Sequence, residues 1–448
     1  MSNLIVHGAT ILTGDIRQPI IRNGFVRIKN DRIADIGRDI DIAMKPDADV
    51  HQIDANGKVV IPGLVNVHTH AILTMVRGVA EDMGFAPAYT VGVPHGHEVT
   101  EEEAVALARL GALEALLFGS TLINDTYVHQ DLTMAAMGEL GLRVWGCGRI
   151  HDVDFSRVHL GEWEHKPDIG EWSLCQALDL HARFHGAENG RLGVQLAAHA
   201  PDTCSRWLLE QIRGARDRLG LRVQSHLSQS KLEVARVRER DGMSPPELYE
   251  DVGLLDESLL AAHCIHLDED DIKRIGRAGV HVAHIAKGNQ TGGTIAPTSA
   301  LRHQGADFAL GTDNMHADMI EVMRWALNSG RVQDGGVSDF WQPSTVFEMA
   351  TMGGARAMGL QNEIGSIEVG KKADLVILDF RRPHLVPMIE PMGNLVHTAQ
   401  GRDVDCVIID GRLIVEGGRA LLVDQDSILR DAQKAADNLW SRAKASST

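Results

Sequence analysis

The 448-residue sequence is poor in cysteine and in positive charge. Its five cysteines are odd in number and show no paired C-x-x-C spacing, which argues against a disulfide framework or a zinc ribbon and favours a reducing compartment. Lysine and arginine number 44 against 61 aspartates and glutamates, so the formal net charge is −17. This balance argues against nucleic acid or an anionic membrane surface as the main partner. The cysteines are Cys147, Cys175, Cys204, Cys264 and Cys406.

Long hydrophobic runs and targeting signals are also missing. No stretch approaches the ~20 apolar residues of a transmembrane helix. The N-terminal residues MSNLIVHGATILTGD lack a basic segment followed by a long apolar run. We therefore expect a cytoplasmic protein without a signal peptide and with no membrane partner. The chain does have 44% hydrophobic residues, enough for a buried core, and 22 histidines, whose placement is the main clue to function.

The middle of the chain alternates short apolar runs with amphipathic stretches. In TEEEAVALARLGALEALLFG, leucines recur at helical spacing behind Thr100, a good N-cap residue. SRWLLEQIRGARDRLG and DEDDIKRIGRAG repeat this scheme and each close on a glycine. Eight strand–helix repeats predict an α/β fold of the (β/α)8 TIM-barrel type. The strand candidates are VVIPGLVNVHTH from Val59, 120–127, 142–150, 192–200, 221–227, 259–266, 279–287 and 306–313.

Both chain ends have a different pattern, typical of short antiparallel strands. Near the C-terminus, Asp410-Gly411 lies between two apolar runs and predicts a two-residue hairpin. Because neither end has enough strands for a sheet of its own, we predict one composite β-sandwich domain from residues 1–60 and 365–425. The barrel is then residues 61–364, and residues 426–448 form a helix and tail.

A barrel of this type places its chemistry at the C-terminal ends of the strands. Here almost every strand candidate ends on an imidazole or a charged side chain, which packing alone does not require. His68 and His70 lie at i and i+2 on one face of a strand, so both can point to one metal ion. His226 and Asp313 can complete a four-ligand N/N/N/O shell. The polar strand ends are His68 and His70, Asp125, Arg149, His199, His226, His263, His284 and Asp313.

With these segments in this order, the sequence resembles the amidohydrolase superfamily, in the branch of the S-adenosylhomocysteine and methylthioadenosine deaminases and the triazine hydrolases. The resemblance runs from the first barrel strand to about Leu422. The matching segments are PGLVNVHTH, LEALLFGST, AHAPDTCS, QSHLSQS, AAHCIHLDEDDI, VAHIAKGNQTGGTIAP, ALGTDN, MATMGGARAMGL and GSIEVGKKADLVILD.

This resemblance implies one divalent metal ion per subunit, with His68, His70, His226 and Asp313 as its ligands. Zinc is the default for this donor set, and iron, manganese or cobalt also fit it. The cation activates a water, Asp313 acts as general base, and His263 orients the nucleophile. His199 falls where relatives contact the substrate. Relatives commonly form homodimers or homotetramers.

One position departs from the deaminase pattern. Deaminases of this branch read HLAE after strand five, and the glutamate shuttles a proton to the leaving group, whereas this chain reads His226-Leu227-Ser228-Gln229. Glutamine cannot relay a proton at neutral pH. Either another acid substitutes, such as Asp313 alone, His95 or His97, or the reaction does not need that proton.

Other departures concern the substrate pocket. The loop after strand one lacks the usual Trp-Leu pair, and Phe85 and Tyr89 are candidates to wall the pocket. His95 and His97 can contact substrate or form a solvated turn. Arg149 fits either an anionic substrate group or a structural ion pair. We also name His284, followed here by Ile-Ala, as a candidate substrate contact, and the Met315-His316 pair changes the pocket floor.

The sequence therefore predicts a metal-dependent hydrolase that cleaves a non-peptide C–N bond of a small nitrogen heterocycle, in the manner of a deaminase. The alternative is hydrolytic displacement of a leaving group such as chloride, or ring-opening amide hydrolysis. A catalytically silent scaffold is the remote alternative, because such proteins typically lose metal ligands and all four are present here.

Overall fold

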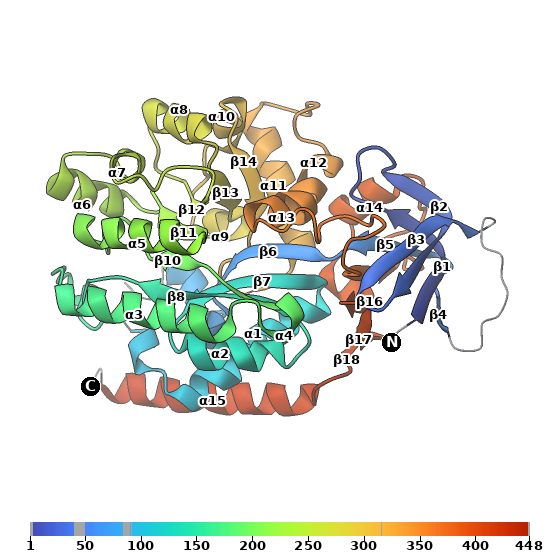
Figure 1. Cartoon of the computed structure of the whole chain (residues 1–448), viewed down its shortest axis with the longest axis horizontal. Coiled ribbons are helices and arrows are strands. Elements are labelled where there is room, and N and C mark those ends of the chain that lie inside the picture. The colour runs from blue at the N-terminus through green and yellow to red at the C-terminus, as the bar shows by residue number, and fades with distance from the viewer. Residues whose placement is uncertain (1–2, 40–49, 84–89, 91, 315, 447–448) are drawn as a thin grey trace.

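The computed structural model describes residues 3–39, 50–83, 90, 92–314 and 316–446. Eight parallel strands, β6 to β8 and β10 to β14, form a barrel (Figure 1). The short strand β9 pairs with β8 outside this order. A bridge between Thr69 and Asp313 joins the last strand back to the first. The strands are β6 (Leu64–Thr69), β7 (Ser120–Tyr127), β8 (Arg143–Ile150), β9 (Leu192–Val194), β10 (Leu196–Ala198), β11 (Val223–Leu227), β12 (Leu259–His263), β13 (His281–His284) and β14 (Asp307–Leu310). The predicted (β/α)8 barrel is confirmed.

The three barrel helices predicted from the sequence are present and start at the expected residues. Thr100, Ser205 and Asp268 each accept a backbone N–H at a helix start, and Gly220 and Gly279 close two of these helices in the left-handed conformation. The longer helices are α1 (Glu101–Leu117), α2 (Gln130–Gly138), α3 (Pro167–Phe184), α5 (Arg206–Leu219), α6 (Lys231–Asp241), α7 (Pro245–Asp251), α8 (Glu269–Ala278) and α11 (Met319–Gln333). Shorter ones are α4 (Ala187–Gly190), α9 (Ala286–Thr291), α10 (Thr298–His303), α12 (Pro343–Glu348), α13 (Gly354–Ala357) and α14 (Pro391–His397).

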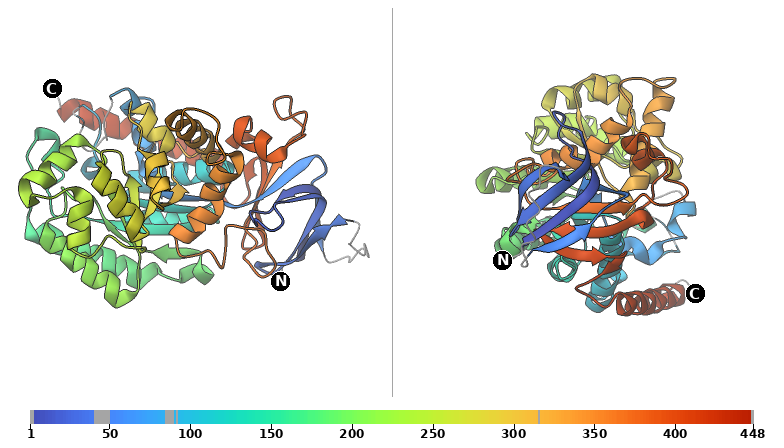
Figure 2. Two further views of the ribbon diagram at one scale, coloured as in Figure 1. Left: turned by 90° about the horizontal axis from the view of Figure 1, so that it is seen from above. Right: turned by 90° about the vertical axis from the view of Figure 1, so that its right-hand side faces the viewer.

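Strands from both chain ends pair into a second, nine-stranded sheet beside the barrel (Figure 2). Its central pairs join β5 to β1 and β5 to β15, so the two ends meet directly as predicted. Asp410 and Gly411, both at positive φ, form the predicted hairpin turn. The strands are β1 (Asn3–Leu12), β2 (Ile20–Lys29), β3 (Arg32–Arg38), β4 (His51–Asp54), β5 (Lys58–Pro62), β15 (Leu375–Asp379), β16 (Val404–Ile409), β17 (Arg412–Glu416) and β18 (Arg419–Ala420).

The sequence suggested that the apolar run from Val59 forms one barrel strand, but it does not. It divides at Gly63 into β5, which ends at Pro62 and belongs to the second sheet, and β6 of the barrel. A Cβ at Gly63 would lie 2.0 Å from the Thr121 hydroxyl, so the chain passes too close to β7 for any side chain. That approach is where the chain changes from one sheet to the other.

Two contacts tie distant parts of the chain to the barrel. Arg143, buried at the start of β8, donates to the Asp374 carboxylate at 2.6 Å and so links the barrel to the second sheet. The C-terminal helix α15 (Gln425–Ser446) packs along α1, and its Trp440 indole donates to the Met75 carbonyl in the short helical turn after β6. Within the described residues, no helix has the length and apolar character needed to cross a bilayer.

Candidate metal centre and active site

The site begins at the C-terminal end of β6, where His68 and His70 point to the same side. Gln224 and Thr126 face their Nδ1 atoms: the Gln224 side-chain oxygen lies 3.3 Å from His68 Nδ1, and the Thr126 carbonyl contacts His70 Nδ1. A carbonyl can only accept, so each Nδ1 donates and each Nε2 carries the free lone pair. Both imidazoles are thereby held in the tautomer that a metal ligand needs.

His226 comes from β11 with the same arrangement. Its Nδ1 lies 2.6 Å from the His199 carbonyl, and its Nε2 is 3.4 Å from His70 Nε2. Nitrogen atoms of His68, His70 and His226 all lie within 4.8 Å of one another. The Nε2 atoms of His70 and His226 both lack a proton, so they form no hydrogen bond with each other. Their separation is compatible with two ligands of one cation.

Asp313 follows β14 and is fixed by the first strand. Its backbone N–H donates to the His68 carbonyl at 3.0 Å, and its own carbonyl accepts from His70 and from the Thr69 hydroxyl. Its carboxylate lies 3.4 Å from His70 Nε2 and 3.9 Å from His68 Nε2. The backbone at Asp313 has φ 64°, a strained value for a residue with a side chain, and such strain concentrates at functional sites.

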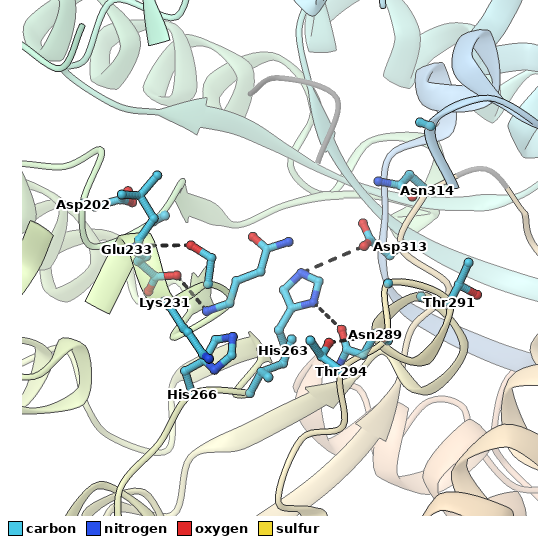
Figure 3. A pocket seen from close by; sticks show the side chains of 18 of the residues that line it. Asp202, Lys231, Glu233, His263, His266, Asn289, Thr291, Thr294, Asp313 and Asn314 are labelled. Carbon is cyan, nitrogen blue, oxygen red and sulfur yellow. Dashed lines mark hydrogen bonds and ion pairs between the residues drawn. The ribbon is translucent and has the colours of Figure 1, made fainter. Parts of the chain in front are cut away.

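His263 lies on the other side of the Asp313 carboxylate, with φ 74°. Its Nδ1 contacts the Asn289 side-chain oxygen at 2.9 Å, and its Nε2 lies 4.0 Å from Asp313 (Figure 3). Because the Asn289 oxygen accepts, the Nε2 lone pair of His263 faces the carboxylate. His263 is thus oriented by α9 toward the point where the other side chains meet.

Burial governs the charge of this cluster. It lowers the pKa of His70 to about 3, of His226 to about 4 and of His263 to about 3, and holds the pKa of His68 well below its usual range. Burial also raises the pKa of Asp313 to about 7. All four imidazoles are therefore neutral at physiological pH, as metal ligation requires.

The donors present fit a divalent cation. The Nε2 atoms of His68 and His263 are buried and find no hydrogen-bond partner in the described part of the chain. A buried polar atom without a partner is costly, and a cation beside His68 and Asp313 would remove that cost. Three imidazoles and one carboxylate are a zinc-type donor set.

A pocket of about 570 Å³ opens beside this centre. His263, Asp313, Asn289 and Asn314 lie at one side of it, and Asp202 and Glu233 lie at the other (Figure 3). Gln229 also lines this pocket. The cavity is large enough for a heterocycle with a substituent, and its walls carry amide groups near the centre and carboxyl groups further out.

Glu233 lies directly behind Gln229. Its carboxylate accepts the backbone N–H groups of Ser228 and Gln229 at 2.6 and 2.7 Å. Burial and the neighbouring Asp202 hold the pKa of Glu233 above its ordinary range. Sequence reasoning gave Glu233 no role, although Ser230 followed by Glu233 is a capping-box pattern that marks a carboxylate turned back onto the chain.

The remaining predicted residues lie around the centre. The His199 ring is 5.0 Å from the His226 ring, and its Nδ1 contacts the Thr203 hydroxyl at 2.8 Å. The Arg149 guanidinium lies over the rings of Tyr127 and Phe155, 5.1 and 4.1 Å from their centroids. His284 is buried against Phe308 at the end of β13. Among the described residues, the pocket lining does not include these three.

Several other positions of interest are now placed. Phe85, Tyr89 and Met315 lie outside the described residues. Lys287, in α9 after β13, lines the pocket and pairs with Glu321 at 2.7 Å. Asp125 accepts the backbone N–H of Ala71 at 2.7 Å and so fixes the chain that follows His70. His95 and His97 lie together in a short turn before α1.

A model of the amidohydrolase family matches residues 59–414. The chain belongs to this family. The resemblance read from the sequence is confirmed, and the amidohydrolase is a hydrolase of carbon–nitrogen bonds other than peptide bonds. The 5-methylthioadenosine/S-adenosylhomocysteine deaminase of Desulforudis audaxviator is 37% identical over 393 residues, which cover 86% of this chain and 88% of the relative.

Solved structures show the same fold for this amidohydrolase. An adenosine deaminase from Xanthomonas campestris with bound zinc has a TM-score of 0.87 at 24% identity, covering 98% of this chain and 99% of its own. The atrazine chlorohydrolase TrzN from Arthrobacter aurescens TC1, complexed with zinc, has a TM-score of 0.85 at 21% identity. The match covers 97% of this chain and 100% of the TrzN chain. Both the amine-releasing and the chloride-releasing chemistries weighed above therefore occur on this fold.

Proposed function

We propose that this amidohydrolase removes an amino group from a small nitrogen heterocycle, using one divalent metal ion per subunit, with zinc as the first candidate. The ligands proposed are His68, His70, His226 and Asp313. The observation that carries the proposal is the meeting of their donor atoms, with the Nδ1 atoms of the three histidines turned to acceptors.

Each residue has a distinct part in this proposal. A cation bound there lowers the pKa of a water molecule from 15.7 toward about 7. Asp313 takes the proton of the nucleophile, since its carboxylate lies next to both ligands and the pocket. His263, held by Asn289, directs the lone pair of its Nε2 to the nucleophile and so orients it. Gln229 offers its amide to the ring of the substrate.

Two further residues adjoin the ligands rather than the pocket. His199 packs on His226, and Arg149 packs on Tyr127, whose ring centroid is 5.8 Å from that of His70. We propose that His199 and Arg149 contact only the part of the substrate that faces the ends of β8 and β10. For His284 and Phe85 the role of substrate contact stays a prediction.

The second candidate reaction is displacement of a non-amine leaving group such as chloride, or opening of an amide-like ring. The observation that favours it is Gln229 itself, which lines the pocket but carries no transferable proton at neutral pH. A good leaving group does not need that proton.

Metal removal and product analysis test both candidates. We expect a chelator to abolish turnover of a panel of aminopurines, pteridines, pyrimidines, triazines, lactams and cyclic ureas, and added zinc to restore it. Release of ammonia supports deamination, whereas chloride or a new carboxylate supports the second candidate. Full turnover by the metal-free protein would contradict both.

We also propose a cytoplasmic homodimer or homotetramer, as the family resemblance implies. Light scattering on the purified protein gives the mass in solution. A mass of one chain, 48.8 kDa, at micromolar concentration would contradict this part of the proposal.

A further inference from the structure

A second cluster of imidazoles lies in the turn before α1, apart from the metal centre. The rings of His95 and His97 are stacked with centroids 5.5 Å apart, and the His159 ring lies 4.7 Å from that of His95. The Glu98 carboxylate lies 3.4 Å from His95 Nδ1. Ligand atoms of His95, His97 and Glu98 all lie within 4.8 Å of one another. None of these residues lines the pocket described above.

The hydrogen bonds of His95 select the tautomer of a metal ligand. Its Nε2 lies 2.9 Å from the Thr90 carbonyl, which can only accept, so Nε2 carries the proton. The lone pair is therefore on Nδ1, the nitrogen that faces Glu98. A ring nitrogen that donates to a backbone carbonyl while the other stays bare is the usual arrangement of a ligating histidine. His70 and His226 show it at the metal centre.

The charges around the turn also favour a cation. The rings of His95, His97 and His159 lie together, with centroids 4.7 to 6.5 Å apart. Glu98 supplies one negative charge beside them. The buried His159 Nδ1 has no hydrogen-bond partner among the described residues and is available as a further donor.

We propose that His95, His97 and Glu98 form a second divalent-metal site, with His159 next to it. Two or three imidazoles with one carboxylate favour zinc or a similar first-row ion over magnesium or calcium, which prefer oxygen donors. In a tetrahedral zinc site with bonds of about 2.0 Å, ligand atoms lie roughly 3.3 Å apart. Because the planes of His95 and His97 are nearly parallel, at 9°, ion binding would turn at least one of these rings as well as bring the ligand atoms closer.

The location gives this site a mechanical role. Gly96, between the two histidines, packs on the Tyr127 ring, and a Cβ there would lie 2.8 Å from it. Tyr127 ends β7 and packs in turn on the His70 ring at 5.8 Å between centroids. A cation bound to the turn would hold the turn against Tyr127, the side chain that packs directly on the proposed ligand His70.

Zinc counting tests the site independently of catalysis. The wild type, His97→Ala and Glu98→Gln are saturated with zinc, desalted and measured by plasma mass spectrometry. We expect the wild type to hold one more zinc per chain than His97→Ala, which keeps His68, His70, His226 and Asp313. His97 is exposed, so its removal leaves the fold intact, and Glu98→Gln retains an acceptor for the His95 backbone N–H.

The matched control is His51→Ala, which removes an exposed histidine from β4 of the second sheet. It should hold as much zinc as the wild type. Equal zinc in the wild type, His97→Ala and Glu98→Gln would overturn the second site whatever the catalytic centre binds. A wild type with one zinc that is lost in His97→Ala but kept in His68→Ala would instead support the second site and contradict the proposed catalytic one.

Discussion

Glu233 accepts the backbone N–H of Gln229 at 2.7 Å, which places a buried carboxyl group directly behind the pocket-lining glutamine that, by the family resemblance, replaces a glutamate. The pocket therefore has an acid near that position, but its oxygen atoms are engaged with the chain rather than extended toward the metal centre. This relationship makes residue 229 the most informative position to change.

Replacing Gln229 with glutamate should increase deamination. The new carboxyl would lie in the buried acidic surroundings of Glu233 and Asp202, where burial raises carboxyl pKa values and so favours the protonated form that a general acid needs. We expect kcat for ammonia release from an aminopurine to rise about 100-fold, the lower end of what general acid catalysis contributes. Gln229→Leu is the control and should lower kcat. If no member of the panel reacts faster with Gln229→Glu, the pocket is built for another leaving group.

Replacing Asn289 should affect turnover more than metal binding. Without the Asn289 oxygen the His263 ring is free to rotate, so its Nε2 no longer faces Asp313. We expect Asn289→Ala to lower kcat about 10- to 100-fold, as loss of a supporting partner commonly does, with zinc content unchanged. Asn289→Asp keeps an acceptor and should recover part of kcat. The control is Asn328→Ala on the exposed side of α11. An unchanged kcat in Asn289→Ala would contradict the proposal that Asn289 orients His263 for catalysis.

Glu233 should make the fold less stable as pH rises. Its pKa is raised in the folded state, so between its ordinary value and that raised value the native protein binds more protons than the unfolded chain. The free energy of unfolding then falls with increasing pH in this window. We expect the free energy of unfolding, measured with urea, to fall less between pH 5 and pH 8 in Glu233→Gln than in the wild type. An equal loss in both proteins would assign the pH dependence to other groups.

Two glycine-to-alanine changes should have opposite effects. A Cβ at Gly111 of α1 would lie 2.6 Å from the Ala71 carbonyl, next to His70, whereas a Cβ at Gly214 of α5 would meet no atom within 4 Å. We expect Gly111→Ala to lower the free energy of unfolding by about 1–3 kcal/mol and to weaken zinc binding. Gly214→Ala should raise it by up to about 1 kcal/mol. Calorimetry and zinc titration measure both, and a stabilised Gly111→Ala would contradict the packing described here.

The strands and the histidine cluster were predictable because both depend on local patterns. Apolar runs of strand length and the rule that barrel chemistry lies at strand ends bring His68, His70, His226, His263 and Asp313 together without any knowledge of contacts. Gly63 was a missed signal, since a lone glycine inside an apolar run often marks a close approach of backbone. Asn289 could not be predicted, because its partner His263 lies 26 positions away and α9 is too short to show a period.

Helix α15 has a consequence for the order in which the protein is built. Met75 and Glu103 receive hydrogen bonds from Trp440 and Arg442, which are 365 and 339 positions later in the chain. At 5–20 residues per second of translation, the nascent segment after His70 waits roughly 20–70 s for these partners. The region that carries the first histidine pair thus acquires its final packing only when nearly the whole polypeptide has left the ribosome.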